Sequence, residues 1–330
     1  MSSTRDLSFD YIKGVLIFLV VLGHVVTYIP YSDFSDNWLF TFIYSFHMPL
    51  FVFISGFFFA SAKNASPGTL LSRKAVRLLL PHFSYSILML LIVFLFYPYF
   101  NKVIYDGDIV SKFKIYHVVF TSLWFLWCVF FCSVIINLIF NYLPRPWLFC
   151  IILCVLMLGF YNYLPHKVFK DMQLIIQMPF FLLGMYYKEN RERIDKYGGV
   201  IFGIVLIGYL LLYRDTVIYS PYYKVLLFMF SVPLFFILLS KIYRYKVITP
   251  LFCFWGEASL GIYVFHLLLM ILTRDNTFYD FKIGIGDYGQ QYWMSVFISV
   301  VVCCFISWLV VQLRKSRFLK FIFLGERRNH

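Results

Sequence analysis

The sequence predicts an all-α integral membrane protein, a bundle of about ten transmembrane helices with both termini in the cytoplasm. Of its 330 residues, 62% are hydrophobic and only 14% are charged, a composition outside the range of soluble globular domains. Apolar runs near the 20 residues that cross a bilayer recur from one end of the chain to the other. The basic residues gather in alternate connecting segments, which is typical of multi-pass membrane proteins.

Taken in order, the apolar runs define ten expected spans and one domain. The spans lie at about 11–30, 38–60, 79–100, 117–140, 147–164, 172–187, 199–213, 223–239, 252–272 and 292–313. The polar segments between them are short, so we expect a single membrane domain over residues 1–330 and no soluble domain. The first run is long and contains Lys13, which argues against a cleavable signal peptide.

The distribution of charge sets the expected orientation. With ten spans, most of the 29 Lys and Arg residues fall on the side of the N-terminus, and cytoplasmic segments carry such an excess. The same bias accounts for most of the net charge of +13. We therefore expect contact with membrane lipid and no nucleic-acid partner.

The first span carries ionisable residues on one face. Lys13 and His24 are eleven residues apart, which places them about 20° apart around a helix and roughly 16 Å apart along it. Asp10 lies one turn before Lys13 on the same side. Ionisable groups within a bilayer are costly and commonly functional, so these three are candidate catalytic residues. The alternative is that a helical bundle merely satisfies them.

The second span adds a second imidazole at a similar depth. His47 precedes Met48-Pro49, where we expect a kink. Counted from the outer ends of their spans, His24 and His47 differ in depth by about 6 Å, so one cavity could hold both, unless His47 makes only an interhelical hydrogen bond. Ser55 lies two turns deeper, beside a glycine that permits close helix approach.

A basic cluster follows on the predicted cytoplasmic side. Arg73, Lys74 and Arg77 precede the third span, and Pro81 is expected to end their run. Arg73 and Arg77 share a helix face, and such a cluster suits a ligand with several phosphates. The alternative is the ordinary excess of positive charge on the inner side.

Two later spans hold further candidates for a cavity. Trp124 belongs to an aromatic run that either lines a cavity or packs in the bundle. Glu257 is an acid at the inner edge of the ninth span, and His266 lies about 13 Å further along that helix. Ser259 and His266 share a face. The seven Cys residues fall within spans and are expected to pack as small apolar groups. No His/Cys cluster has ligand spacing, so no metal site is expected.

Together, these motifs resemble the acyltransferase-3 family of integral membrane acyltransferases, which includes bacterial polysaccharide O-acetyltransferases. The matching segments, in chain order, are D-x-x-K-G-x9-H (10–24), F-H-M-P-L-F-V-F-I-S-G-F (46–57), S-R-K-x-x-R-L-x-x-P (72–81), L-W-F-L (123–126) and S-L-G-I-Y-x-x-H (259–266). The family usually has Arg at the position of Lys13. Lysine keeps the charge but loses the bidentate fork of a guanidinium.

The resemblance implies transfer of an acetyl or other short acyl group from cytoplasmic acetyl-coenzyme A to a hydroxyl of a surface polysaccharide or lipid-linked glycan, in a bacterial inner membrane. It implies no bound cofactor, and the oligomeric state stays open. His24 would be the general base, with Asp10, Lys13 and His47 assisting. The donor would be threaded from the basic cluster through a continuous polar cavity to His24. The alternative is a proton-coupled transporter or flippase of a glycan or glycolipid.

Overall fold

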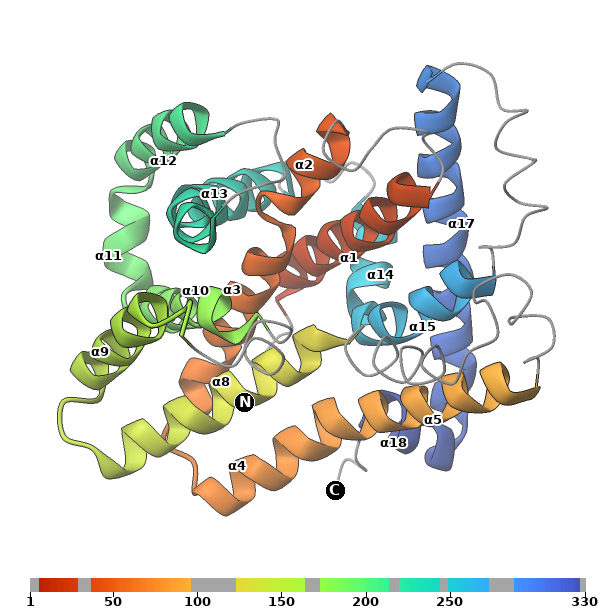
Figure 1. Ribbon diagram of the computed structural model, residues 1–330, viewed down its shortest axis with the longest axis horizontal. Helices are drawn as coiled ribbons and strands as arrows, with labels where there is room; N and C mark the ends of the chain where they lie inside the picture. Colours follow the sequence, from red (N-terminus) through yellow and green to blue (C-terminus); the bar gives the residue numbers. More distant parts are fainter. Residues whose placement is uncertain are drawn as a thin grey trace.

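The computed structural model describes residues 6–28, 37–95, 123–163, 173–213, 220–243, 249–272 and 288–326, and in these ranges the regular structure is helical throughout (Figure 1). The first half contains α1 (Leu7–Tyr28), α2 (Trp38–Tyr44), α3 (His47–Phe59), η1 (Ala60–Ala62), α4 (Pro67–Lys74), η2 (Ala75–Leu79), α5 (Leu80–Leu95), α8 (Trp124–Tyr142) and α9 (Pro146–Gly159). The second half contains α10 (Leu174–Glu189), α11 (Arg191–Lys196), α12 (Gly198–Leu212), α13 (Pro221–Ile242), α14 (Thr249–Glu257), α15 (Ser259–Leu272), α17 (Tyr288–Lys315) and α18 (Arg317–Leu324).

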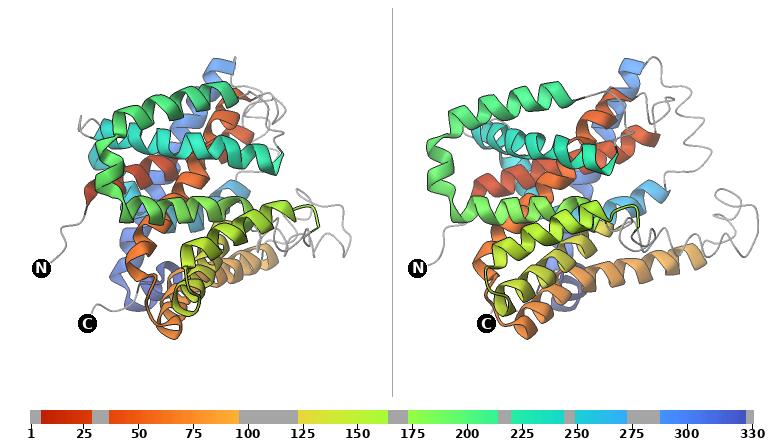
Figure 2. Two further views of the ribbon diagram at one scale, coloured as in Figure 1. Left: turned by 90° about the vertical axis from the view of Figure 1, so that its left-hand side faces the viewer. Right: turned by 60° about the vertical axis from the view of Figure 1, so that its left-hand side comes forward.

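The helices confirm the predicted class of helical membrane protein. Within the described ranges, six helical stretches are long and apolar enough to cross a membrane, counting α2 to η1 and α4 to α5 as one stretch each. The bent pair α14–α15 makes a seventh if it counts as one span. Two shorter apolar helices are α9 and α12. A helix lies at each of the ten predicted positions, but the number of spans that cross the bilayer and the side of the termini stay predictions. The start of α1 and the short α11 lie on the same side, at the left in both views of Figure 2.

Helix α1 is the centre of the bundle (Figure 1). It packs against α2, α3, α13, α14, α15 and α17. Its residues Ile12, Leu16, Ile17 and Val21 are almost completely buried. Burial on several sides explains why the polar residues of α1 face protein, where other groups can satisfy them, instead of lipid.

Glycines bring α1 and α14 into direct backbone contact. A Cβ atom at Gly14 would lie 1.8 Å from the carbonyl oxygen of Phe252, and one at Gly256 would lie 1.8 Å from that of Asp10. No side chain fits at either position. Only small residues such as glycine let two helix backbones in a membrane approach this closely. The contact sets the register of α14 against the motif residues of α1.

A second glycine pair joins α3 and α10. Cβ atoms at Gly56 and Gly184 would each lie 1.9 Å from a carbonyl oxygen of the other helix. Lys63, just after α3 and η1, forms an ion pair with Glu189 at the end of α10. The two helices therefore run in the same direction, and their N-terminal ends face the same side of the bundle.

The second predicted span is broken, as its proline suggested, but just before the expected kink. Ser45 and Phe46 form a turn between α2 and α3, which places Pro49 in the first turn of α3, where the missing N–H is not needed. Side chains satisfy the freed backbone: the Ser231 hydroxyl donates to the carbonyl oxygen of Ser45 (2.8 Å). The Ser45 and Tyr209 hydroxyls are 3.0 Å apart.

The expectation that Pro81 ends the helical run is wrong. The helix begins at Pro67 and continues to Leu95 through the π-helical segment η2, so the basic cluster lies on a helix that starts well before residue 79. The Leu80 N–H donates to the carbonyl oxygen of Ala75, five residues back. This wider turn just before the proline relieves the clash that its ring would make in an α-helix.

The ninth span is also broken, contrary to the straight helix expected from the sequence. Helices α14 and α15 meet at Ala258 with a bend of 76°. Glu257 therefore ends one helix while Ser259 begins the next, and the 13 Å separation expected along a straight axis between Glu257 and His266 does not apply.

The glycine contact between α1 and α14 predicts the effect of one added methyl group. Gly256→Ala should lower the melting temperature in detergent by at least about 2 °C, because overpacking costs about 1–3 kcal/mol. Gly203→Ala in α12 is the control, since no atom lies within 4 Å of its added Cβ, and it should leave stability unchanged or slightly raised. Equal melting curves for the two variants would contradict the contact.

Candidate functional site

A cavity of about 370 Å³, here the basic cavity, opens between α1, α3, α8, α15 and the helix that carries the basic cluster. Its walls contain apolar side chains, mainly aromatic and aliphatic. The polar and charged residues that line it are Lys13, Ser55, Lys74, Arg77, Ser259 and Tyr263. The cavity thus joins the motif of the first span to part of the basic cluster.

Lys13 is held at the wall of the basic cavity by its neighbour one turn earlier. The Lys13 Nζ lies 2.7 Å from the Asp10 Oδ1, and Asp10 is only 4% exposed. A buried carboxylate requires such a partner, because an unpaired charge in this environment is strongly destabilising. Asp10 therefore fixes the ammonium of Lys13, and this ion pair is the contact made where the resembling family has Arg.

The break between α14 and α15 adds a helix N-terminus to the basic cavity. Ser259, the first residue of α15, lines the cavity together with Lys74 and Arg77. The N-terminus of a helix carries partial positive charge and N–H groups that lack intrahelical acceptors. Added to the nearby cations, it makes the cavity suited to phosphate or another anion.

A second cavity, of about 250 Å³ and here called the histidine cavity, lies at the N-terminal ends of α3 and α10. Its polar and aromatic lining residues are Thr41, Tyr44, Ser45, His47, Trp124, Gln173, Gln177, Lys224 and Phe228. The His47 Nδ1 lies 2.6 Å from the carbonyl oxygen of Ile43. Since a carbonyl only accepts, Nδ1 carries the proton and Nε2 is left as an acceptor.

Three imidazoles and one phenol ring, here the imidazole row, neighbour one another beside the two cavities. The ring of Tyr263, on the basic cavity, lies 5.8 Å from that of His266, and the ring of His266 lies 5.2 Å from that of His24. His24 interacts electrostatically with both His266 and His47, and His47 lines the histidine cavity. His24 therefore neighbours one imidazole on the wall of the histidine cavity and another that contacts Tyr263 on the wall of the basic cavity.

The expected cavity that holds both His24 and His47 stays a prediction. His47 lines the histidine cavity, whereas His24 is half-buried and lines neither of these two cavities. Met48 is part of the wall of both cavities, which the sequence alone does not indicate.

Some of the other residues predicted from the sequence line a cavity, and others do not. Trp124 lines the histidine cavity, and Ser55 and Ser259 line the basic cavity. His266 lies behind the cavities, against His24. Arg73 is exposed and lines neither cavity, unlike the other two members of the cluster. No group of three His, Cys, Asp or Glu side chains in the described ranges is arranged to hold a metal ion.

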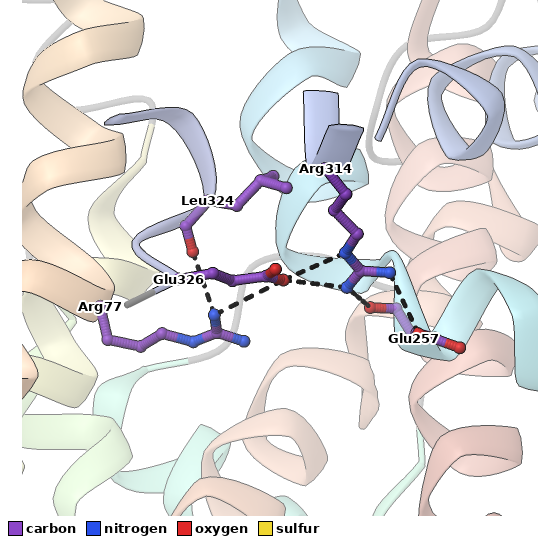
Figure 3. Close-up of polar contacts among 5 residues, drawn as sticks. All are labelled: Arg77, Glu257, Arg314, Leu324 and Glu326. Atoms are coloured by element: carbon purple, nitrogen blue, oxygen red, sulfur yellow. Dashed lines mark hydrogen bonds and ion pairs between the residues drawn. The ribbon is translucent and has the colours of Figure 1, made fainter. Parts of the chain in front are cut away.

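Glu257, proposed from the sequence as a possible cavity residue, lies outside both cavities and belongs instead to an ionic network (Figure 3). Arg314 donates to its carboxylate (3.1 Å) and to its carbonyl oxygen (3.3 Å), which caps the end of α14. Arg314 also pairs with Glu326 at 3.0 Å, and Glu326 lies 3.8 Å from Arg77. Arg77 in turn donates to the carbonyl oxygen of Leu324 (3.1 Å). The segment after α18 is thereby held beside a residue of the basic cavity.

Sequence reasoning missed several lining residues. Gln173 and Gln177 lie four apart at the start of an otherwise apolar helix, and this spacing of two amides was a usable signal. In the sequence, Lys224 is only one of the charges on the predicted outer side, and Tyr263 is only one residue of the motif at 259–266. Glu326 sits in a basic terminal segment where no pattern indicates its partner.

Comparison with known proteins identifies relatives of the chain. A family model described as an acyltransferase domain matches residues 6–312. The nodulation protein NolL of Sinorhizobium fredii is 30% identical over 202 residues, which are 58% of this chain and 51% of that protein. NolL of Mesorhizobium japonicum is 44% identical over 86 residues, 24% of this chain and 22% of that protein. The chain thus matches about half the length of the first relative and less of the second, and no solved structure matches it.

The ionic network predicts how the C-terminal segment responds to loss of Arg314. Arg314→Met should make trypsin cleave after Arg317 and Lys320 several-fold faster in detergent, because α18 loses its tie to α14. Lys315→Met is the matched control, since the Lys315 ammonium contacts only Gln312 among the described residues. Equal cleavage rates in the two variants, followed by mass spectrometry, would show that the network does not hold α18.

Proposed function

Because the chain belongs to the acyltransferase-3 family, we propose that it is a membrane O-acetyltransferase. It transfers an acetyl group from cytoplasmic acetyl-coenzyme A to a hydroxyl of a cell-surface polysaccharide or lipid-linked glycan, in a bacterial inner membrane. The observation that carries the proposal is the position of His24, which neighbours His47 of the histidine cavity and, through His266 and Tyr263, the wall of the basic cavity. A donor in one cavity and an acceptor in the other would both lie near this group.

In this proposal the donor occupies the basic cavity. The phosphates of coenzyme A contact Lys74, Arg77 and the N-terminus of α15, and the thioester lies nearer Lys13. Coenzyme A is cytoplasmic, so this cavity faces inward, in agreement with the predicted orientation. Arg77 already has Glu326 as a neighbour at 3.8 Å, so a donor phosphate would share or replace that contact.

The chemistry is direct acyl transfer. The neutral imidazole of His24 takes the proton of the acceptor hydroxyl as its oxygen attacks the thioester carbonyl carbon. The carbon–sulfur bond then breaks, and the thiolate of coenzyme A takes up the proton from the His24 imidazolium. His266 supports this step. Its Nδ1 is bonded to main-chain carbonyl oxygens (2.8 and 3.1 Å), which leaves Nε2 as an acceptor beside His24.

A transport function is the second candidate, and one observation favours it. Two spans are interrupted inside the bundle, by a turn at Ser45–Phe46 and by the bend at Ala258, and interrupted helices are common at the binding sites of transporters. Labelled acetyl-coenzyme A added to proteoliposomes separates the two. Label recovered in glycan supports the enzyme, whereas glycan that crosses the bilayer without any acyl donor supports the carrier.

The His24 imidazole should be essential for transfer and dispensable for donor binding. His24→Gln should lower the transfer rate by about 10²–10⁴-fold, the usual contribution of a general base, while the affinity for acetyl-coenzyme A stays within about twofold. His82→Gln is the control, because His82 is a buried imidazole on α5 that lines neither cavity. Wild-type transfer by the His24 variant would remove this residue from the mechanism.

The basic cluster should divide into residues that bind the donor and one that does not. Lys74→Gln and Arg77→Gln should each raise the KM for acetyl-coenzyme A, with a smaller fall in kcat, because contacts to remote phosphates stabilise substrate and transition state alike. Arg73→Gln should leave KM unchanged, since Arg73 lies outside the cavity. A similar rise in all three variants would instead indicate a general effect of positive charge.

A further inference from the structure

The histidine cavity contains a buried acceptor that no protein group uses. Gln177 is 3% exposed and lines the cavity. Its Oε1 has no hydrogen-bond partner among the described residues. Buried polar atoms in native proteins are nearly always bonded, and an exception calls for a specific explanation, such as a bound group that donates to it. A sugar hydroxyl is a donor of this kind.

Other polar groups of the cavity are already engaged with the main chain. The Thr41 hydroxyl donates to the carbonyl oxygen of Asn37 (3.2 Å), and the Ser45 hydroxyl donates to that of Phe42 (2.7 Å). Among the remaining lining residues, Gln177 and Lys224 have capacity for a ligand. Trp124 adds a flat apolar surface beside them. A mostly apolar wall with a few placed polar groups is the usual composition of a small-molecule site.

Lys224 gives the cavity its charge. It is half-buried on α13 and forms no ion pair within the part of the chain that the structure describes, and no carboxylate lines the cavity. A lysine in such a place attracts an anion, and the low local dielectric strengthens that attraction. The other ionisable group in the wall, His47, is bonded through its Nδ1 and offers an acceptor instead of a second charge.

We propose that the histidine cavity is the acceptor subsite and that it takes a sugar bearing an anionic group, with Gln177 bonding a hydroxyl and Lys224 pairing with the anion. This inference rests on the proposed acetyl transfer, because it assigns the acceptor to the cavity that the donor does not occupy. His47 lines this cavity and neighbours His24. The anion is either a carboxylate of the sugar or a phosphate of a lipid carrier.

Binding of small probes to the purified full-length protein tests the subsite without any acyl donor. The probes are methyl β-D-glucuronide, the neutral methyl β-D-glucoside and a short-chain polyprenyl diphosphate, with affinities measured by ligand-observed NMR. The wild type should bind the glucuronide or the diphosphate about tenfold more tightly than the glucoside, as expected for a charge-assisted contact. The anionic probe that Lys224→Gln weakens identifies the source of the anion.

Matched variants separate the two roles. Lys224→Gln should abolish the preference for the anionic probe, whereas Lys241→Gln, an exposed lysine on the same helix, should retain it. Gln177→Met should weaken both sugars by a few-fold and leave their ratio unchanged. The inference is overturned if no sugar binds, if Lys224→Gln keeps the preference, or if Lys241→Gln also loses it.

Failure of the subsite and failure of the enzymatic proposal give different results. If the protein binds the anionic probe through Lys224 but never transfers acetyl from acetyl-coenzyme A to any glycan, the acetyltransferase proposal fails and the binding site stands. If acetyl transfer occurs while Lys224→Gln leaves the preference between anionic and neutral probes intact, the subsite alone is wrong.

Discussion

The backbone contact between α1 and α14 is the constraint on which the site depends. Gly14 and Gly256 leave no room for a side chain, so the two helices have one possible separation at this point. The bend at Ala258 lies two residues after Gly256. Beyond it, α15 packs against α1. That path brings His266 against His24, ten residues further along α1 than Gly14. A single close contact thus sets the register of His266 against His24.

The two broken spans solve the same physical problem. An interrupted helix inside a membrane protein exposes backbone groups that lipid cannot satisfy. Ser231 bonds the carbonyl oxygen left free at Ser45, and Arg314 bonds the one left free at Glu257. Each break also begins a new helix at a cavity, α3 at the histidine cavity and α15 at the basic cavity. The polar surface needed for binding polar ligands therefore comes from interrupted helices in an otherwise apolar chain.

The sequence was sufficient to predict the class of fold and several of the residues that line the cavities. Apolar runs predict spans because a bilayer requires them, and the costly ionisable groups Asp10, Lys13 and His24 stand out within such runs. Their common face follows from helical geometry alone. In the structure Lys13 lines the basic cavity and His24 lies against His266. The basic cluster likewise fell beside Lys13, because Lys74 and Arg77 line the same cavity.

Tertiary packing determined which residues meet, and the periodicity of the sequence cannot predict this. Arg73 and Arg77 look equivalent in the sequence, yet of the two only Arg77 lines the basic cavity. The sequence also could not show that Met48 lies in the wall of both cavities, that Glu257 pairs with Arg314, or that Gln177 and Lys224 line the same cavity. Each of these relations joins residues distant in the chain and depends on how whole helices cross. The sequence by itself determined which polar groups the membrane domain must shelter, and the packing of the helices decided which of them meet.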